Sequence, residues 1–275
     1  MLLLPEDITE VEWKRPQEIA GGDAAFVTSG ITRFDVIQGR LANCWFIGVL
    51  ANLADTKNKD ATVLEKLFDE HQSIDNENAE FTFYFRRNGE WEEVTVDDSL
   101  PCKPESETLL FCKSEDPAEF WPSLLEKAYA QFKGSYADLE WDYAVTALNE
   151  LTDDDWEKMR EFADMYVPIC HSIDCCGIVL TSTIRDPDNI LPEVNLVARH
   201  VYSITGHKVD ETFGQCLRIR NPWGSHEYNG PEAHLDNEKE DGEFYISWDN
   251  FCRYFKNITW KMSHRNKYQK WLEET

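Results

Sequence analysis

The chain has 275 residues, of which 42% are hydrophobic and 13% aromatic. This composition excludes an intrinsically disordered protein, because such chains lack the large apolar residues that form a core. The 27 basic and 52 acidic residues give a net charge of −25, which disfavours nucleic acid and anionic membranes as partners and favours cations or basic proteins. Solvated surface carboxylates account for most of such a charge.

The cysteines and the amino-terminal segment indicate in which cellular compartment the protein is expected. Eight cysteines occur without a Cys-x-x-Cys pair or a regular disulfide spacing. The leucine run before Pro5 is too short for a secretory signal, and no apolar stretch reaches transmembrane length. A cytoplasmic protein with free thiols is therefore expected.

Three segments of the first half carry clear secondary-structure signals. In QGRLANCWFIGVLANLA, residues 38–54, the apolar residues recur on one helical face, which predicts a helix that begins at Cys44. Alternating phenylalanines in 81–85 and the turn at Asn88-Gly89 predict a β-hairpin. Residues 117–134 repeat the helical period and end at a glycine.

After about residue 150 the pattern changes. The acidic segment 153–165 predicts one more helix. Short β-rich runs follow at 177–183, 200–209, 215–223 and 242–248. The sequence thus predicts an α+β protein with a helical first part, residues 1–152, and a β-rich second part, residues 153–275.

Cys44 stands where a helix is expected to start. The unpaired N–H groups and the dipole of a helix N-terminus favour a thiolate, which is the reactive form of a cysteine. A buried cysteine that packs as a small hydrophobe is the alternative, and we keep it for the other seven cysteines.

A cysteine nucleophile needs an imidazole as base, a group that orients the imidazole, and donors for the oxyanion. His200 begins a strand-like run, and Asn221 follows it in RIRNPWG. The order Cys, His, Asn is that of papain-like proteases. Trp223 would shield the hydrogen bond between His200 and Asn221, and Gln38 could join the Cys44 N–H in an oxyanion hole.

Several local motifs are more specific than this order. QGRLANCWFIGVLANLA, ARHVYSITG, LRIRNPWG and EDGEFYISWDNF resemble the cysteine, histidine, asparagine and closing segments of the calpain family. VEWKRPQEI, VTVDDSLPC and EFWPSLLEKAYAQFKGSYADL add collinear similarity over nearly the whole chain. The resemblance implies a papain-like core with two lobes, a helical one that carries the cysteine and a β-rich one that carries the histidine and the asparagine.

The resemblance also implies an activity. Calpains are intracellular, calcium-regulated cysteine endopeptidases that cleave protein substrates through an acyl-enzyme. It makes Cys44 the nucleophile, His200 the general base and acid, and Asn221 the orienting residue. Gln38 becomes the oxyanion donor, and Trp223 becomes the shield between the lobes.

Calcium ligands follow from the same resemblance. In the first lobe it implies Asp35 with the carbonyl groups of Thr28 and Gly30, whereas Ala137 stands where a partner glutamate is expected, next to Asp138. In the second lobe the implied ligands are Glu227, the Lys239 carbonyl, Asp241 and Glu243, in a loop shorter than that of the family. Because Ca²⁺ takes six to eight oxygen ligands, acidic loops without calcium remain the alternative.

Three departures from the family pattern concern glycines. Ala42 precedes Cys44 by two residues, Arg199 directly precedes His200, and Asp153-Asp154 replaces a glycine pair near the lobe boundary. Glycines beside a cleft allow a substrate backbone to approach closely. Arg199 could therefore occlude the cleft, select acidic substrates or lower the pKa of the imidazole.

Two other functions stay open. A calpain-like module with impaired catalysis could act as a calcium-responsive interaction or scaffolding domain, and acyl transfer of the transglutaminase kind also uses a cysteine and a histidine. The expected partners are protein substrates, with regulatory domains or subunits outside this chain. A monomer is expected, and the chain is either an excised core or a branch without a calmodulin-like module.

Overall fold

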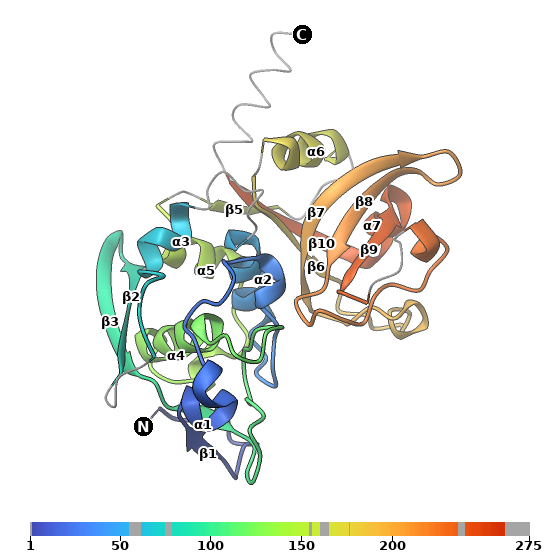
Figure 1. Ribbon diagram of the computed structural model, residues 1–275. Helices are drawn as coiled ribbons and strands as arrows, with labels where there is room; N and C mark the ends of the chain where they lie inside the picture. The colour runs from blue at the N-terminus through green and yellow to red at the C-terminus, as the bar shows by residue number, and fades with distance from the viewer. Residues whose placement is uncertain are drawn as a thin grey trace.

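The computed structural model describes residues 2–54, 62–74, 79–153, 156–159, 165–175, 177–235 and 240–261. It has two halves that lie side by side, one mainly helical and one built on a sheet (Figure 1). The first half contains β1 (Glu12–Lys14), α1 (Pro16–Ala20), η1 (Gly21–Asp23), η2 (Arg33–Asp35), α2 (Cys44–Leu53), α3 (Thr62–Leu67), β2 (Glu80–Arg87), β3 (Glu90–Asp97), β4 (Leu100–Cys102), α4 (Trp121–Lys133), η4 (Ala137–Leu139) and α5 (Ala144–Leu151).

The second half contains β5 (Trp156–Met159), α6 (Tyr166–Asp174), β6 (Val179–Thr183), η5 (Pro192–Val194), β7 (Val201–Asp210), β8 (Gly214–Arg220), η6 (Ala233–Leu235), β9 (Glu243–Ser247), α7 (Trp248–Tyr254) and β10 (Phe255–Lys261). Its six-stranded antiparallel sheet has the order β5-β10-β6-β7-β8-β9. The fold is α+β, as the sequence predicts.

Helix α2 is the centre of the first core. All of its residues after Cys44 are buried, and its aromatic Phe46 stacks on Tyr129 of α4 with ring centroids 4.3 Å apart. A second apolar cluster joins the sheet to α6 and α7. Each half thus has an apolar core of its own, although Trp156, Ile178 and Leu180 pack into the first one.

Most sequence-predicted elements are confirmed. Helix α2 begins at Cys44, and the hairpin β2–β3 turns at Asn88 and Gly89, which both have positive φ as a two-residue hairpin turn requires. Helix α4 begins at Trp121 and ends before Gly134. The four β-rich runs form β6, β7, β8 and β9.

The helix predicted for residues 153–165 is wrong in its first part. Trp156–Met159 is strand β5, which pairs with Ile258–Lys261 of β10. The Trp156 ring is buried in the first core, so long-range pairing and burial override the local helical period. Residues 154–155 and 160–164 lie outside the described part of the chain.

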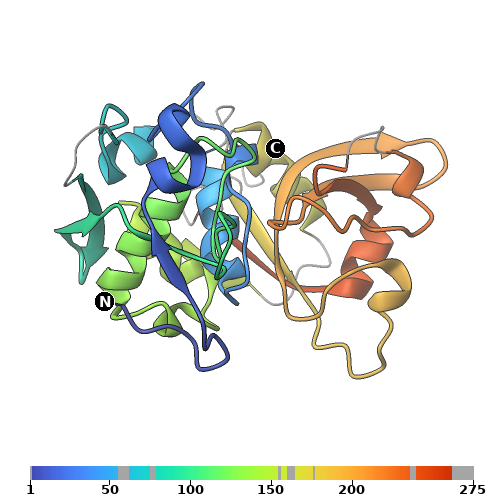
Figure 2. The same ribbon diagram turned by 60° about the horizontal axis from the view of Figure 1, so that its bottom comes forward.

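The two halves meet where α2 packs against β7. A Cβ added at Gly48 would lie 3.3 Å from Cγ1 of Val201 and 3.4 Å from Cδ2 of Leu180, so the helix approaches the sheet closely at this point. Both views place α2 at the border between the halves (Figures 1 and 2). In the part of the chain that the structure describes, no helix has the length and apolarity needed to cross a membrane.

Candidate active site

The first turn of α2 is held by contacts on both sides of Cys44. The indole N–H of Trp45 donates to the Leu139 carbonyl at 2.8 Å. The loop before the helix passes so close to residues 110–111 that a Cβ at Gly39 would lie 2.2 Å from the Phe111 carbonyl oxygen. Only glycine fits at Gly39, which gives a steric reason for the Gln-Gly pair.

Asn43, the N-cap residue of α2, is fixed by a buried glutamate. Its Nδ2 donates to Oε1 of Glu126 in α4 at 2.7 Å, and the other carboxylate oxygen accepts the Cys112 N–H at 2.9 Å. Burial raises the pKa of Glu126 to about 7. The residue next to Cys44 is therefore positioned by a carboxyl group that titrates near neutral pH.

The Cys44 thiol is partly buried against the second half. Burial raises its pKa, and hydrogen bonds from the backbone N–H groups of Val201, Trp45 and Cys44 itself lower it by less. Val201 is the first residue of β7 and the chain neighbour of His200. The thiol thus reaches the strand that follows the histidine, and its raised pKa keeps it predominantly neutral at pH 7.

His200 and Asn221 form a buried hydrogen-bonded pair. His200 Nε2 lies 2.9 Å from Asn221 Oδ1, and the two residues are 4% and 0% exposed. Oδ1 also accepts the Trp223 N–H, while Nδ2 donates to the His226 carbonyl, so the amide orientation is defined by its neighbours. Nε2 must then carry the proton, which leaves Nδ1 with a lone pair.

Trp223 covers the imidazole. Its ring centroid lies 4.7 Å from that of His200 at an interplanar angle of 48°, and Tyr202 meets the imidazole edge-on at 5.0 Å. Burial lowers the pKa of His200 to about 4. The imidazole is therefore neutral at physiological pH and able to accept a proton.

Gln38 lies at the contact between the halves. Its Nε2 donates to the Leu41 carbonyl at 2.7 Å, and its backbone N–H donates to the Pro222 carbonyl, next to Asn221. One amide hydrogen remains for another acceptor, and Oε1 is buried without a hydrogen-bond partner among the described residues.

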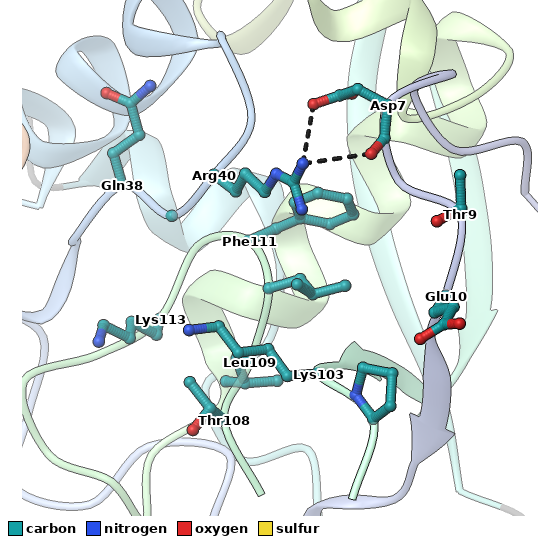
Figure 3. A pocket seen from close by; sticks show the side chains of 13 residues that line it. Asp7, Thr9, Glu10, Gln38, Arg40, Lys103, Thr108, Leu109, Phe111 and Lys113 are labelled. Atoms are coloured by element: carbon teal, nitrogen blue, oxygen red, sulfur yellow. Dashed lines mark hydrogen bonds and ion pairs between the residues drawn. The ribbon is translucent and has the colours of Figure 1, made fainter. Parts of the chain in front are cut away.

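A pocket of about 590 Å³ is lined in part by Gln38, Gly39 and Arg40, in the loop that precedes α2. Figure 3 shows Arg40 reaching Asp7 across this pocket, at 3.0 Å, while the Gln38 side chain runs away from Lys103. Basic and acidic side chains both line it, so it has no dominant charge.

The implied calcium ligands of the first lobe lie among half-buried carboxylates. Both Asp35 oxygens accept hydrogen bonds from Thr32, and the Thr28 N–H donates to Glu119 at 3.0 Å. Burial raises the pKa of Asp35 and of Glu119, and the negative charge of Asp35 adds to the shift of Glu119. Gly30 lies in the exposed loop between Thr28 and Asp35.

Glu119 is thus an acidic neighbour of Asp35, together with Glu115 and Asp116, whose negative charges also raise the pKa of Asp35. Asp138, beside Ala137, accepts a hydrogen bond from Ser135 instead. Glu119 lies just before α4 and is 2% exposed. A buried and a half-buried carboxylate that repel each other suit a hard divalent cation, which prefers oxygen ligands.

The second-lobe candidates are engaged with protein partners. Glu227 Oε1 accepts the N–H groups of Asp241 and Gly242, and Asp241 Oδ1 accepts the Glu243 N–H. Glu243 pairs with Arg33 of the first half at 3.0 Å and with Arg218 at 3.6 Å. Lys239 lies outside the described residues. Among the described residues, no group of three or more His, Cys, Asp or Glu side chains is arranged to hold a metal ion.

The glycine replacements have different surroundings. Arg199 has φ 56°, in the left-handed region where glycine is preferred, and it is exposed beside His200. The Asp153 carboxylate pairs with Lys66 at 2.6 Å and accepts a hydrogen bond from the Trp91 indole N–H. Asp154 is not described.

Trp141 lies beside the loop that precedes Cys44. Its backbone N–H donates to the Ala42 carbonyl, two residues before Cys44, and its φ is 65°. Its side chain is 72% exposed. Sequence reasoning missed Trp141, Glu119 and Glu126, because positive φ and burial of a charged side chain leave no periodic signal.

Comparisons with known proteins show the family of the chain. Residues 3–261 match the family described as "Calpain family cysteine protease". The chain is 35% identical to the calpain-2 catalytic subunit of Mus musculus over 293 residues, covering 95% of this chain and 41% of that protein. It is 33% identical to a calpain of Schistosoma mansoni over 293 residues, which cover 93% of this chain and 36% of that protein. It is 35% identical to Calpain clp-1 of Caenorhabditis elegans over 279 residues, which cover 90% of this chain and 34% of that protein. The chain spans about two fifths of the length of the first of these relatives. It belongs to the calpain family of cysteine proteases.

Proposed function

We propose that the chain is an endopeptidase in which Cys44 is the nucleophile and His200 the general base. The observation that carries the proposal is the buried His200–Asn221 hydrogen bond beneath Trp223, at the start of the strand whose N–H contacts the Cys44 thiol. Asn221 fixes the tautomer in which Nδ1 can accept a proton.

The chemistry then follows from the positions of the donors. Nδ1 of His200 takes the thiol proton, and the thiolate attacks the substrate carbonyl carbon. The remaining Gln38 amide hydrogen and the Cys44 N–H bind the oxyanion. His200 returns the proton to the leaving amine, and water then hydrolyses the thioester with His200 again as base.

The arrangement described here corresponds to a resting state. The His200 ring bonds Asn221, the thiol bonds backbone N–H groups, and burial keeps both groups neutral. Activation requires a direct contact between Sγ and Nδ1. A movement of β7 relative to α2 would change the distance between these two atoms, because Val201 adjoins both Cys44 and His200.

We propose that calcium regulates this movement through the first-lobe carboxylates. A bound Ca²⁺ would neutralise the repulsion between Asp35 and Glu119. Thr28 and Gly30 would add carbonyl oxygens, as hard cations require. The loop that carries Thr28, Gly30 and Asp35 leads directly into Gln38 and α2. Calcium bound to this loop would therefore help to fix the positions of the oxyanion donors.

The second-lobe set would need rearrangement before it could bind calcium. Glu243 would have to leave Arg33 and Arg218, and the N–H groups now bound by Glu227 would need other acceptors. We therefore favour the first-lobe set as the calcium site that operates on this chain.

The lobe boundary, the location and the partners are also proposals. The two apolar cores support a division near residue 152 into a helical and a β-rich lobe. A cytoplasmic protease acting on protein substrates, with further domains or subunits, agrees with the calpain relatives, of which this chain covers about two fifths.

One observation favours a second function, that of a calpain-like interaction module with weak catalysis. Arg199 and Trp141 place large side chains beside the active site. These side chains could hinder a substrate backbone.

Replacement of Cys44 by alanine tests the proposal. The C44A protein should keep its fold and lose peptide hydrolysis by at least about 10³-fold, because the nucleophile is gone. Cys252→Ala, which removes an exposed thiol on α7, is the matched control and should retain activity. Hydrolysis by C44A near the wild-type rate would exclude this mechanism.

A further inference from the structure

A second pocket, of about 240 Å³, lies between the two halves beside the candidate active site. Arg199 and Val201 line it, and they flank His200 in the chain. Trp141 also lines it and donates its backbone N–H to the Ala42 carbonyl near Cys44. A side chain in this pocket would belong to a residue close to the reacting peptide bond.

The pocket is basic, although the protein is strongly acidic. Four of its lining residues are cationic, namely Lys158, Arg185, Arg199 and Lys256. Asp142 is the one carboxylate among the lining residues that the structure describes. It accepts hydrogen bonds from the Tyr143 N–H and the Thr146 hydroxyl, and it lies 4.0 Å from Lys133. Its Oδ1 is thus engaged by donors of the protein, and one carboxylate stands against four cations.

Polar groups on neighbouring strands also line the pocket. The Asn257 Nδ2 donates to the Ser182 hydroxyl at 2.6 Å, and the Thr181 hydroxyl donates to the Asn257 carbonyl at 2.7 Å. Thr181 and Asn257 are buried and already hydrogen-bonded, so the donors left for a ligand are the cationic side chains. A carboxylate is the acceptor that such donors bind most strongly.

Aromatic side chains supply the apolar part. Trp141 and Tyr143 are 72% and 60% exposed, and the Lys158 ammonium lies 3.8 Å from the centre of the Tyr143 ring. Such a wall suits the methylene groups of a glutamate and holds one cation in place. Arg199, at φ 56°, is kept in a conformation that costs energy for a residue other than glycine, as is often found at functional sites.

We propose that this pocket is a specificity subsite that binds the carboxylate side chain of a glutamate or aspartate in the substrate, within a few residues of the cleaved bond. The inference rests on the proposed peptidase function and adds its substrate class. Arg185 and Arg199 act as the cationic donors, Lys256 adds positive charge, and the aromatic wall binds the side-chain stem.

The test uses epoxysuccinyl peptides that differ in one side chain, which is Glu, Gln, Leu or phosphoserine, varied at each position in turn. The second-order rate of Cys44 alkylation is measured by intact mass and peptide mapping, in calcium buffer. At one position the Glu peptide should react about tenfold faster than the Gln and Leu peptides, the effect of roughly 1.4 kcal/mol. This preference should fall between low and high salt.

Single substitutions identify the cationic side chains that produce the preference for the Glu peptide. Lys256→Gln and Arg185→Gln should each reduce the ratio of Glu to Gln rates several-fold, because each removes one positive charge from the pocket. Arg253→Gln on α7 removes the same charge from an exposed position outside the pocket and should leave the ratio as in the wild type.

The outcomes separate the two proposals. Equal Glu and Gln rates at every position, with Cys44 labelled, would overturn the acidic subsite and leave the nucleophile in place. A phosphoserine peptide that reacts faster than the Glu peptide would replace the carboxylate by phosphate as the preferred group. Failure of all peptides to label Cys44 would instead contradict the peptidase function.

Discussion

At the scale of single residues, hydrogen-bond direction defines the chemistry of His200. Asn221 accepts from the Trp223 N–H and donates to the His226 carbonyl, and these two contacts identify its oxygen. His200 must therefore present a free lone pair at Nδ1. The sequence order Cys, His, Asn predicted this pair, and the structure adds the tautomer.

Arg199→Gly tests the cost of the left-handed backbone. Because Arg199 has φ 56°, the substitution should raise the free energy of unfolding by about 1 kcal/mol, as measured by urea titration. Asn189→Gly is the control, since Asn189 has φ 53° and asparagine tolerates this region. Destabilisation of the Arg199 variant would mean that its side-chain contacts outweigh the strain.

At the scale of elements, sequence periodicity located the helix that begins at Cys44 and the strands that adjoin His200 and Asn221. Helix α2 and strands β7 and β8 follow from local patterns of apolar residues. Strand β5 does not, because Trp156–Met159 is extended only through its pairing with β10. Glu119 was missed for a related reason: its neighbours Thr28 and Asp35 are about 90 residues away in the chain, and one sequence carries no signal for such contacts.

The contact between α2 and α4 predicts a pH dependence of stability. Burial raises the pKa of Glu126 from 4.5 to about 7, so the folded protein binds more protons than the unfolded chain between these values. The free energy of unfolding should therefore fall, by about 3 kcal/mol from this group, as pH rises from about 4.5 to about 7.

Glu126→Gln should remove this decrease. Asn43 Oδ1 is buried without a hydrogen-bond partner among the described residues, so rotation of its amide lets it accept from the new glutamine N–H. Urea unfolding between pH 5 and pH 8 measures the difference, and Glu70→Gln at an exposed position serves as control. Unchanged pH dependence in the Glu126 variant would contradict the assignment of this group.

At the scale of the whole molecule, the two halves are held by contacts that surround the active site. Gln38 bonds the Pro222 carbonyl, Arg33 pairs with Glu243, and Cys44 reaches Val201. Rearrangement of one half against the other therefore changes the distance between the thiol and the imidazole directly. The sequence predicted an α+β fold, whereas the relation of the halves depends on long-range contacts.

Calcium should stabilise the folded protein through the first-lobe carboxylates. At a calcium concentration about 100 times the dissociation constant, the gain is about 2.7 kcal/mol, seen as a higher Tm than in chelator. Glu119→Gln should abolish most of this shift, because it removes one anionic ligand. Asp23→Asn, an exposed change of equal charge, should retain it. A full calcium shift in the Glu119 variant would exclude this site.

The most direct test of the account is the labelling of Cys44 with an epoxysuccinyl thiol inhibitor, in calcium and in chelator, followed by intact mass and peptide mapping. We expect selective modification of Cys44 among the eight cysteines, fast in calcium and slow in chelator, because burial keeps the resting thiol neutral. Labelling spread over exposed cysteines such as Cys175 and Cys252, with Cys44 unmodified in both conditions, would contradict the assignment of a cysteine nucleophile at Cys44.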